Sequence, residues 1–218
     1  IKDRLGKTIE NVELIKAATP GRNLNTTLDR RLQYLAYRSL KTAVMEFGAR
    51  SGSAVVLEVA TGEVLAMVNQ PSYNPNQRSG RYEHMRNRAI TDFFEPGSVI
   101  KPFSVAAVLE SGQHAPDSEV EKAAVSYGYG LSTTPLQRAQ AYAAIANNGR
   151  IRAPSFVKGS VNPDRAVVDP TIALELSNMM ETVTRDGGTG TRAAVPHYRV
   201  AGKTGTSRKA SAKGYNDR

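Results

Sequence analysis

The sequence contains no cysteine and no tryptophan, and its only histidines are His84, His114 and His197. Without cysteine the chain can form neither a disulfide nor a thiolate metal site. The three histidines lie far apart in sequence, so we expect no metal site and no cofactor. The chain also has no signal peptide and no uninterrupted apolar run long enough to cross a bilayer.

The charge of the chain is strongly basic. The sequence has 29 Lys and Arg residues against 20 Asp and Glu residues, for a formal charge of +9. Such a balance favours contact with anionic surfaces or polymers. No cluster of aromatic and basic residues marks a nucleic-acid groove, so we interpret the excess as a solvated basic surface and expect no nucleic-acid partner. At 218 residues the chain can bury the core of one domain.

Hydrophobic periodicity and turn signals predict helices mixed with hairpin strands. The helices are expected over 27–47, 98–111, 135–148 and from 169 onward, and the strands over 53–59, 64–68 and 198–207. Thr134, Pro135 and Gln137 form the pattern of a helix capping box. This mixture predicts an α/β domain (α+β type) with a mainly antiparallel sheet flanked by helices.

Ser98 and Lys101 form the first chemically suggestive pair, in the stretch FEPGSVIKPF. Three residues apart at the start of a helix, they share one face. A lysine amine that has lost hydration beside Val99 and Ile100 can take the serine's proton. The positive end of the helix would favour the resulting anion. The pair therefore suggests a nucleophile and its general base.

The same S-x-x-K pattern occurs a second time, at Ser155 and Lys158. This stretch follows Pro154 and reads as extended chain. An odd separation along a strand places the two side chains on opposite faces. We therefore reject this pair as a catalytic site, and we note that the short pattern alone has little specificity.

A second motif, Lys203-Thr204-Gly205-Thr206, occurs once, and we call it the KTGT segment. Glycines at 202 and 205 remove side chains and allow another backbone to lie close to the strand. A substrate peptide can then add as a further strand. Lys203 supplies positive charge, and Thr204 and Thr206 supply hydroxyls, a set suited to a peptide that ends in a carboxylate.

S-x-x-K followed by K-T-G is the signature of penicillin-binding proteins and class A β-lactamases. The blocks SGSAVVLEVATGEVLAMVNQPSYNPN, MRNRAITDFFEPGSVIKPF, YGYGLSTTPLQRAQAYAAIANNG and AGKTGTS follow in the order expected for a class B penicillin-binding protein. Over most of residues 20–215 the chain resembles the division-specific, septal (FtsI-like) D,D-transpeptidases of Gram-negative bacteria. The resemblance implies a penicillin-binding-protein/β-lactamase-like transpeptidase fold.

The resemblance also implies a role for each motif residue. Ser98 would attack a D-Ala-D-Ala donor, with Lys101 as general base, and the backbone N–H groups of Ser98 and Thr206 would form the oxyanion hole. Lys203, Thr204, Gly205 and Thr206 would bind the donor. The implied partners are peptidoglycan stem peptides that provide donor and amine acceptor, β-lactam antibiotics, and septal division proteins including a glycosyltransferase. The implied location is the periplasm, with a single N-terminal anchor in the inner membrane that this chain lacks.

One family motif, S-x-N, is missing between the other two. Ser72-Tyr73-Asn74 precedes the nucleophile, and Ser160-Val161-Asn162 follows the YGYG block in an expected surface turn. The missing motif predicts that the transpeptidase domain, residues 27–218, is incomplete because of a break near Val120–Glu121. We predict separately that residues 1–26 are the remnant of an N-terminal module and linker. A genuinely shortened, inactive protein is the alternative.

Three functions are compatible with these observations. The first is a septal peptidoglycan D,D-transpeptidase that β-lactams acylate and inhibit. The second is a β-lactamase, although no candidate base for a hydrolytic water is apparent and the SYNPN and YGYGL blocks argue against it. The third is a non-enzymatic β-lactam-binding sensor domain. Turnover of the acyl-enzyme and activity on a D-Ala-D-Ala peptide distinguish them.

Overall fold

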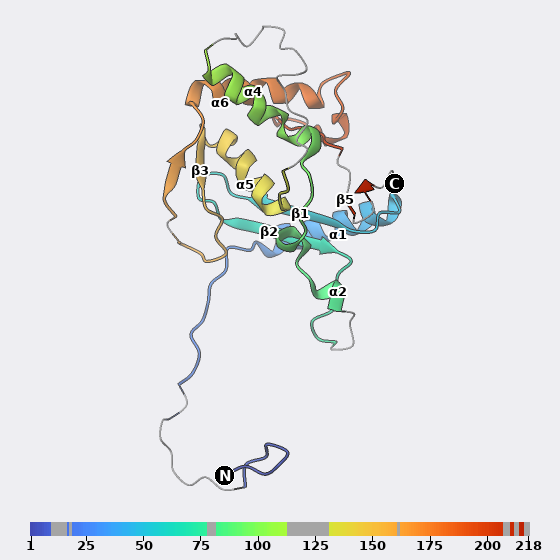
Figure 1. Cartoon of the computed structure of the whole chain (residues 1–218), viewed down its shortest axis with the longest axis vertical. Helices are drawn as coiled ribbons and strands as arrows, with labels where there is room; N and C mark the ends of the chain where they lie inside the picture. The colour runs from blue at the N-terminus through green and yellow to red at the C-terminus, as the bar shows by residue number, and fades with distance from the viewer. Residues whose placement is uncertain are drawn as a thin grey trace.

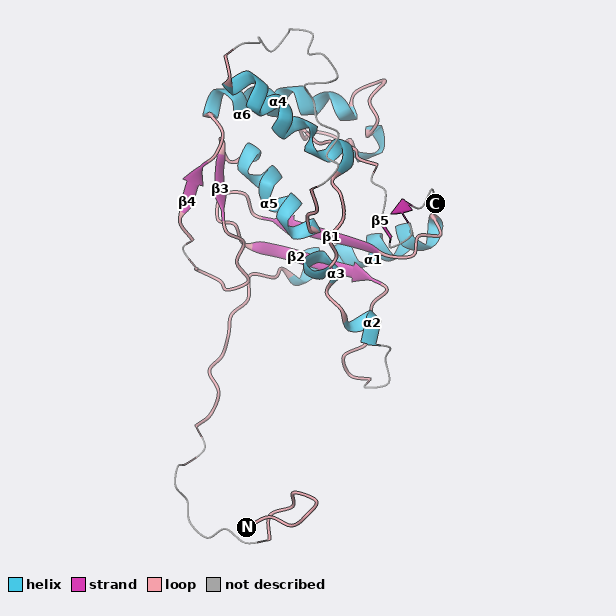
Figure 2. Ribbon diagram, viewed as in Figure 1, coloured by secondary structure: helices cyan, strands magenta, loops and turns pink. Residues whose placement is uncertain are grey.

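The computed structural model describes residues 1–9, 17, 19–77, 82–112, 131–160, 162–206, 210–211 and 214–215. Figures 1 and 2 show helices grouped around short strands, with the N-terminal residues drawn apart from this body. In chain order the elements are α1 (Arg30–Glu46), β1 (Gly52–Leu57), β2 (Val64–Gln70), α2 (Tyr82–Met85), α3 (Arg88–Thr91), η1 (Gly97–Ile100), α4 (Lys101–Glu110), α5 (Pro135–Ala146), β3 (Arg150–Arg152), β4 (Asp164–Ala166), α6 (Pro170–Met180), η2 (Glu181–Thr184), η3 (Thr191–Ala193), β5 (Ala210–Ser211) and β6 (Gly214–Tyr215).

The strands pair as antiparallel hairpins. β1 and β2 pair in a register that runs from Gly52 opposite Gln70 to Leu57 opposite Val64, with a bulge after Val56. β3 pairs with β4, and β5 with β6, each as a separate two-stranded sheet within the described part of the chain. The hairpin predicted for the strands at 53–59 and 64–68, and the predicted antiparallel character, are therefore confirmed.

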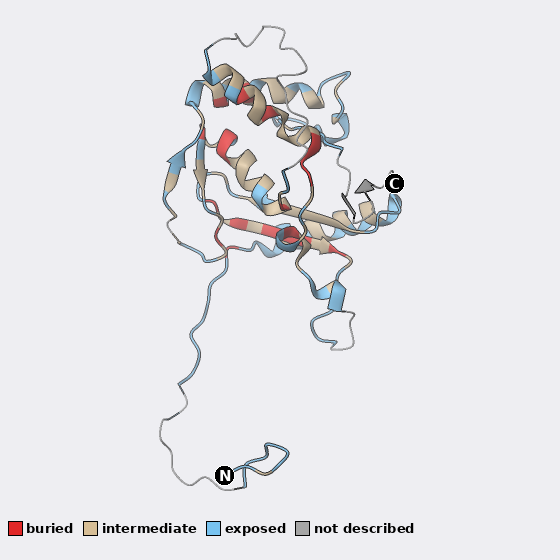
Figure 3. Ribbon diagram, in the orientation of Figure 1, coloured by how far each residue is buried: buried red, intermediate tan, exposed pale blue. Residues whose placement is uncertain are grey.

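Buried residues form two clusters, drawn in red in Figure 3. The first centres on Val64, Met67 and Ala89, on the hairpin and α3. The second centres on Ala106, Ile145 and Leu176, which come from α4, α5 and α6 respectively. The second cluster joins the three helices that surround the predicted catalytic residues.

The first long helix begins later than the sequence predicts. α1 starts at Arg30 rather than Thr27, because the Asp29 carboxylate accepts hydrogen bonds from the backbone N–H groups of Arg31 and Leu32. Thr27 is buried instead, and its hydroxyl donates to the carbonyl of Val64 over 2.7 Å. Tertiary contacts with β2 thus hold Thr27 outside the helix.

The predicted starts of the helices at 135 and 169 are confirmed. Thr134 and Gln137 make both hydrogen bonds of the capping box at the start of α5. Asp169 caps α6 by accepting from the Thr171 N–H at 2.8 Å, with Pro170 in the first turn.

No helix in the described residues is sufficiently long and apolar to span a membrane.

The predicted strand over 198–207 is wrong for the residues that the structure describes. Residues 200–206 carry no strand assignment. The Gly202 N–H donates instead to the carbonyl of Met180, at the end of α6, over 3.1 Å. A helix end therefore takes the hydrogen bond that a neighbouring strand would otherwise make.

Candidate active site

Ser98 lies in a tight turn at the entrance to α4. Residues 97–100 form one turn of 3₁₀-helix, and the Lys101 N–H donates to the carbonyl of Ser98. We call residues 96–101 the Ser98 turn. Gly97 has φ +55°, a conformation that suits glycine and sets the direction of the turn. The helix predicted from residue 98 thus begins as a 3₁₀ turn, in which side chains three apart lie one above the other, so Ser98 and Lys101 share a face.

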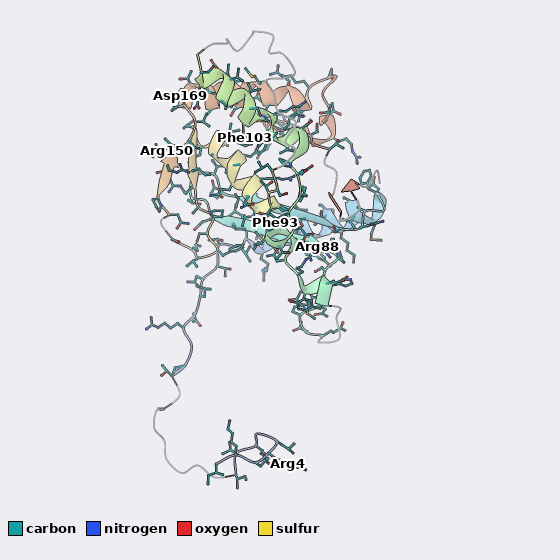
Figure 4. The ribbon with its side chains drawn as sticks, in the orientation of Figure 1. Arg4, Arg88, Phe93, Phe103, Arg150 and Asp169 are labelled. Carbon is teal, nitrogen blue, oxygen red and sulfur yellow. The ribbon has the colours of Figure 1, made fainter. Side chains whose placement is uncertain are left out.

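Helix α5 supports the Ser98 turn from the side of Val99. The Tyr142 hydroxyl donates to the carbonyl of Val99 over 2.7 Å. The Tyr142 ring packs edge-to-face against Phe103, with centroids 5.4 Å apart and an interplanar angle of 89°. Burial raises the pKa of Tyr142 to about 12, so this hydroxyl keeps its proton and remains a donor at neutral pH. Figure 4 shows Phe103 between α4 and α5.

A second contact from α5 holds the segment that leads into the Ser98 turn. The Arg138 guanidinium lies 3.6 Å from the centroid of the Phe94 ring and donates to the Phe94 carbonyl over 2.7 Å. It also donates to the hydroxyl of Thr133 over 2.9 Å. Burial lowers the pKa of Arg138, although Tyr142 opposes the shift. Because Arg138 and Tyr142 are four residues apart, they lie on one face of α5, where Tyr142 contacts the turn and Arg138 contacts the segment before it.

The KTGT segment lies against the Ser98 turn. A Cβ atom placed on Gly205 would come within 2.3 Å of Val99 Cγ2 and 3.4 Å of the Val99 backbone nitrogen. Only glycine fits at this distance. Gly205 therefore packs against the side chain of Val99, the residue after Ser98. The substrate strand predicted to lie along this glycine stays a prediction.

Two polar contacts involve the KTGT segment. The Lys203 ammonium donates to the carbonyl of Thr204 over 2.8 Å. The Thr204 hydroxyl lies 2.7 Å from the hydroxyl of Thr189. Lys203, Thr204, Gly205 and Thr206 are all exposed, so they are accessible to a ligand.

A cavity of about 340 Å³ opens between α4, α6 and the KTGT segment. Lys101 and Lys203 both line it, together with Thr189. The remaining walls are largely apolar and come from Val105, Leu176, Met179, Met180 and Val183. A concave apolar site with a few convergent polar groups is typical of small-molecule and peptide binding.

The structure thus brings several predicted site residues together. Lys101 and Lys203 share the cavity, and Gly205 contacts Val99 beside Ser98. In the second S-x-x-K pair, Ser155 lies in extended chain as predicted, since Ser155 and Val157 form isolated bridges with Glu63 and Thr26, whereas Lys158 lies in the turn that follows. Ser160 donates to the side chain of Asn162, which donates to the Ala153 carbonyl, and neither residue lines the cavity. Among the described residues, no three His, Cys, Asp or Glu side chains group as a metal site would require.

Three residues of this region were missed in the sequence: Arg138, Tyr142 and Thr189. The i, i+4 spacing of Arg138 and Tyr142 shows that they share a helix face, but not what that face contacts. Thr189 stands between Gly188 and Gly190, which gives no chemical signal. Each contact joins segments distant in sequence, so only the tertiary structure shows it.

Comparison with protein families confirms the resemblance. The model described as "Penicillin binding protein transpeptidase domain" matches residues 52–122 and 111–218. The chain belongs to the penicillin-binding-protein transpeptidase family. Its two matched segments contain Ser98 and Lys101 in the first and the KTGT segment in the second.

Curated members of this transpeptidase family align with nearly the whole chain. The probable peptidoglycan D,D-transpeptidase PbpC of Pseudomonas aeruginosa is 32% identical over 298 aligned positions, which cover 98% of this chain and 53% of the relative. The peptidoglycan D,D-transpeptidase FtsI of Escherichia coli K12 is 34% identical over 296 positions, covering 98% and 50%. The chain therefore spans about half the length of these relatives.

Two solved structures have the same fold. The apo structure of the TP domain from Burkholderia pseudomallei penicillin-binding protein 3 matches with a TM-score of 0.74 at 28% identity, covering 91% of this chain and 82% of that one. A crystal structure titled as a peptidoglycan glycosyltransferase from Burkholderia ambifaria matches with a TM-score of 0.69 at 30% identity, covering 85% and 82%. The predicted transpeptidase fold is confirmed.

Proposed function

We propose that this chain is the catalytic domain of a peptidoglycan D,D-transpeptidase that works through an acyl-enzyme on Ser98. One observation carries the proposal: Lys101 and Lys203 line one cavity, and Gly205 packs on Val99, directly beside Ser98. A nucleophile with a neighbouring amine and a cationic segment suits a donor that ends in a carboxylate. The names of the curated relatives support the reaction class.

In the proposed reaction the Ser98 oxygen attacks the carbonyl carbon of the penultimate D-Ala of the donor. Lys101 accepts the serine proton, and the backbone N–H groups of Ser98 and Thr206 stabilise the oxyanion. The peptide C–N bond then breaks, and the terminal D-Ala leaves after its amine gains a proton. Lys203, Thr204 and Thr206 hold the donor carboxylate. An acceptor amine attacks the ester, forms the cross-link and frees Ser98.

The proposed role of the whole protein is stem-peptide cross-linking at the division septum. This follows from the FtsI-like sequence blocks, and the Escherichia coli relative carries that name. The protein would be held in the inner membrane by one N-terminal helix, with this domain in the periplasm. Its partners would include septal division proteins and a glycosyltransferase, and β-lactams would mimic the donor and trap Ser98.

We also propose that the sequence near Val120–Glu121 joins two parts that lie apart in the relatives, with the S-x-N motif in the intervening segment. The junction lies outside the described residues. Two observations support the proposal: the family match falls into two segments that overlap at 111–122, and the alignments run over more positions than the 218 residues of this chain. Residues 27–218 would then be the transpeptidase domain, preceded by the remnant of an N-terminal module. Peptide mapping of the purified protein across residues 111–135 tests this directly, and a continuous Val120–Glu121 peptide would contradict a missing segment.

Intact mass spectrometry with and without penicillin tests the proposed function. We expect one covalent adduct, absent from Ser98→Ala. An adduct that persists in this variant would overturn the assignment of the nucleophile. Slow loss of the adduct separates a transpeptidase from a β-lactamase, and release of D-Ala from a D-Ala-D-Ala peptide separates an enzyme from a sensor domain.

A further inference from the structure

The hydroxyl of Thr189, which lines the cavity, meets the hydroxyl of Thr204 from the KTGT segment. Thr189 Oγ1 lies 2.7 Å from Thr204 Oγ1, and the two threonines are 15 residues apart in sequence. Thr189 lines the cavity beside Lys203. Both threonines are exposed, so burial does not explain the contact. The pair lies where the proposed function requires an anion to bind.

The backbone on both sides of Thr189 is held by hydrogen bonds to η2 and to Arg185, the residue that follows it. The Gly190 N–H donates to the Val183 carbonyl over 2.9 Å, and the Gly188 N–H donates to the Arg185 carbonyl over 2.8 Å. A Cβ atom on Gly188 would come within 2.3 Å of the Val183 oxygen, so this close packing requires glycine. These contacts therefore fix the position of the Thr189 backbone beside the cavity.

Binding of an anion would fix which of the two hydroxyls donates the hydrogen bond between Thr189 and Thr204. Each hydroxyl has one proton, and a carboxylate can only accept hydrogen bonds. If the Thr204 hydroxyl donates its one proton to a ligand carboxylate, it has no proton left to donate to Thr189. Its oxygen can then only accept the hydrogen bond between the two threonines. Thr189 then donates to Thr204, and the aligned pair strengthens the charge-assisted bond to the carboxylate.

We propose that Thr189 is a positioning residue that orients the Thr204 hydroxyl toward the carboxylate of the ligand. This inference rests on the part of the proposed function that assigns carboxylate binding to the KTGT segment. Thr189 does not contact the reacting atoms. Its role is to favour ligands ending in a free carboxylate over neutral ligands of the same shape.

The test compares binding of N-acetyl-D-alanyl-D-alanine and its C-terminal amide in a Ser98→Ala background, where no acylation occurs. The acid should bind more tightly than the amide. Thr189→Val keeps the shape but removes the hydroxyl, and it should reduce this preference about fivefold, the effect of one net hydrogen bond. Thr189→Ser should keep the preference. Thr191→Val, the same change two residues away, is the matched control and should also keep it.

The acid-to-amide ratio separates positioning from a general structural role, because a distorted cavity would weaken both ligands alike. An unchanged ratio in Thr189→Val would overturn the proposal, as would the absence of any preference for the acid before that substitution. Failure of the proposed function has a different readout, since it would appear as a missing penicillin adduct on the protein with Ser98 intact.

Discussion

The Ser98 turn and the KTGT segment lie against each other at Val99 and Gly205, yet they are held in different ways. The Ser98 turn is supported by partly buried side chains of α5, through Tyr142 and Arg138. The KTGT segment is exposed and depends on one backbone bond from Gly202, one hydroxyl contact from Thr204 and the packing of Gly205. A nucleophile requires a fixed position, whereas a segment that binds a peptide must leave its polar groups accessible.

Gly205→Ala should have the largest effect, because it forces the two regions apart. The added Cβ would lie 2.3 Å from Val99 Cγ2, on a side chain with little rotamer freedom. A displacement of the order of 1 Å can cost about a hundredfold in rate, so we expect penicillin acylation of Ser98 to slow by roughly ten- to a hundredfold. Stopped-flow or mass-resolved acylation kinetics measure this.

Gly21→Ala is the control for this prediction, since its Cβ would meet no atom within 4 Å and Gly21 does not line the cavity. Adding Val99→Ala to Gly205→Ala removes the clashing methyl group and should restore part of the lost rate. Rates that do not recover in the double variant would show that Gly205 acts by some means other than this contact.

Arg138→Met should weaken the support of the Ser98 turn. It removes the hydrogen bonds to Phe94 and Thr133 and the cation–π contact, and we expect unfolding to become easier by about 1–2 kcal/mol. Acylation should slow as well, because Phe94 leads directly into the Ser98 turn. Denaturant unfolding and acylation kinetics check the two effects.

Arg150→Met provides the comparison for Arg138. Arg150 is exposed and pairs with Asp164 on the β3–β4 hairpin, away from the cavity lining. This change should leave the acylation rate unaltered. Equal slowing by both arginine substitutions would contradict a specific support of the Ser98 turn.

Tyr142→Phe should alter the stability of the protein at alkaline pH. The unfolded tyrosine ionises near pH 10.0, whereas burial raises the folded pKa to about 12. Between these values the unfolded chain loses a proton that the folded state keeps, so folding stability falls as pH rises. The protonated Tyr142 hydroxyl makes its full contribution to folding stability below pH 10.0. Unfolding curves across this window should show a shallower decline for Tyr142→Phe, and identical slopes would contradict the buried hydroxyl.

Asp164→Asn should have the smallest effect and should leave the active site unchanged. The hydrogen bond from Arg150 holds the pKa of Asp164 below its ordinary value of 3.8, against the opposing effect of desolvation. A lowered folded pKa contributes stability above pH 3.8 that is lost as pH falls through the folded pKa. The variant should therefore show a slightly weaker loss of stability in acid. A change in acylation rate would mean that the hairpin and the cavity are coupled.

Much of the fold and of the candidate site could be predicted from local sequence patterns. The Ser98–Lys101 spacing, the Thr134–Gln137 capping box and the β1–β2 hairpin each depend on residues only a few positions apart. Such patterns act through backbone geometry, which is the same in any protein. The glycines at 202 and 205 predicted the approach of another backbone, whereas the neighbour that Gly205 meets in the structure is the Val99 side chain.

Only the tertiary structure decided what these elements contact. Thr27 stays outside α1 because Val64, 37 residues away, accepts its hydroxyl bond. The predicted strand at 200–206 is not assigned, and Gly202 bonds to the end of α6. Tyr142 reaches Val99 across 43 residues, and Arg138 reaches Phe94 across 44. These contacts depend on how helices pack around a shared core, and hydrophobic packing is non-directional, so local patterns do not specify which residues meet.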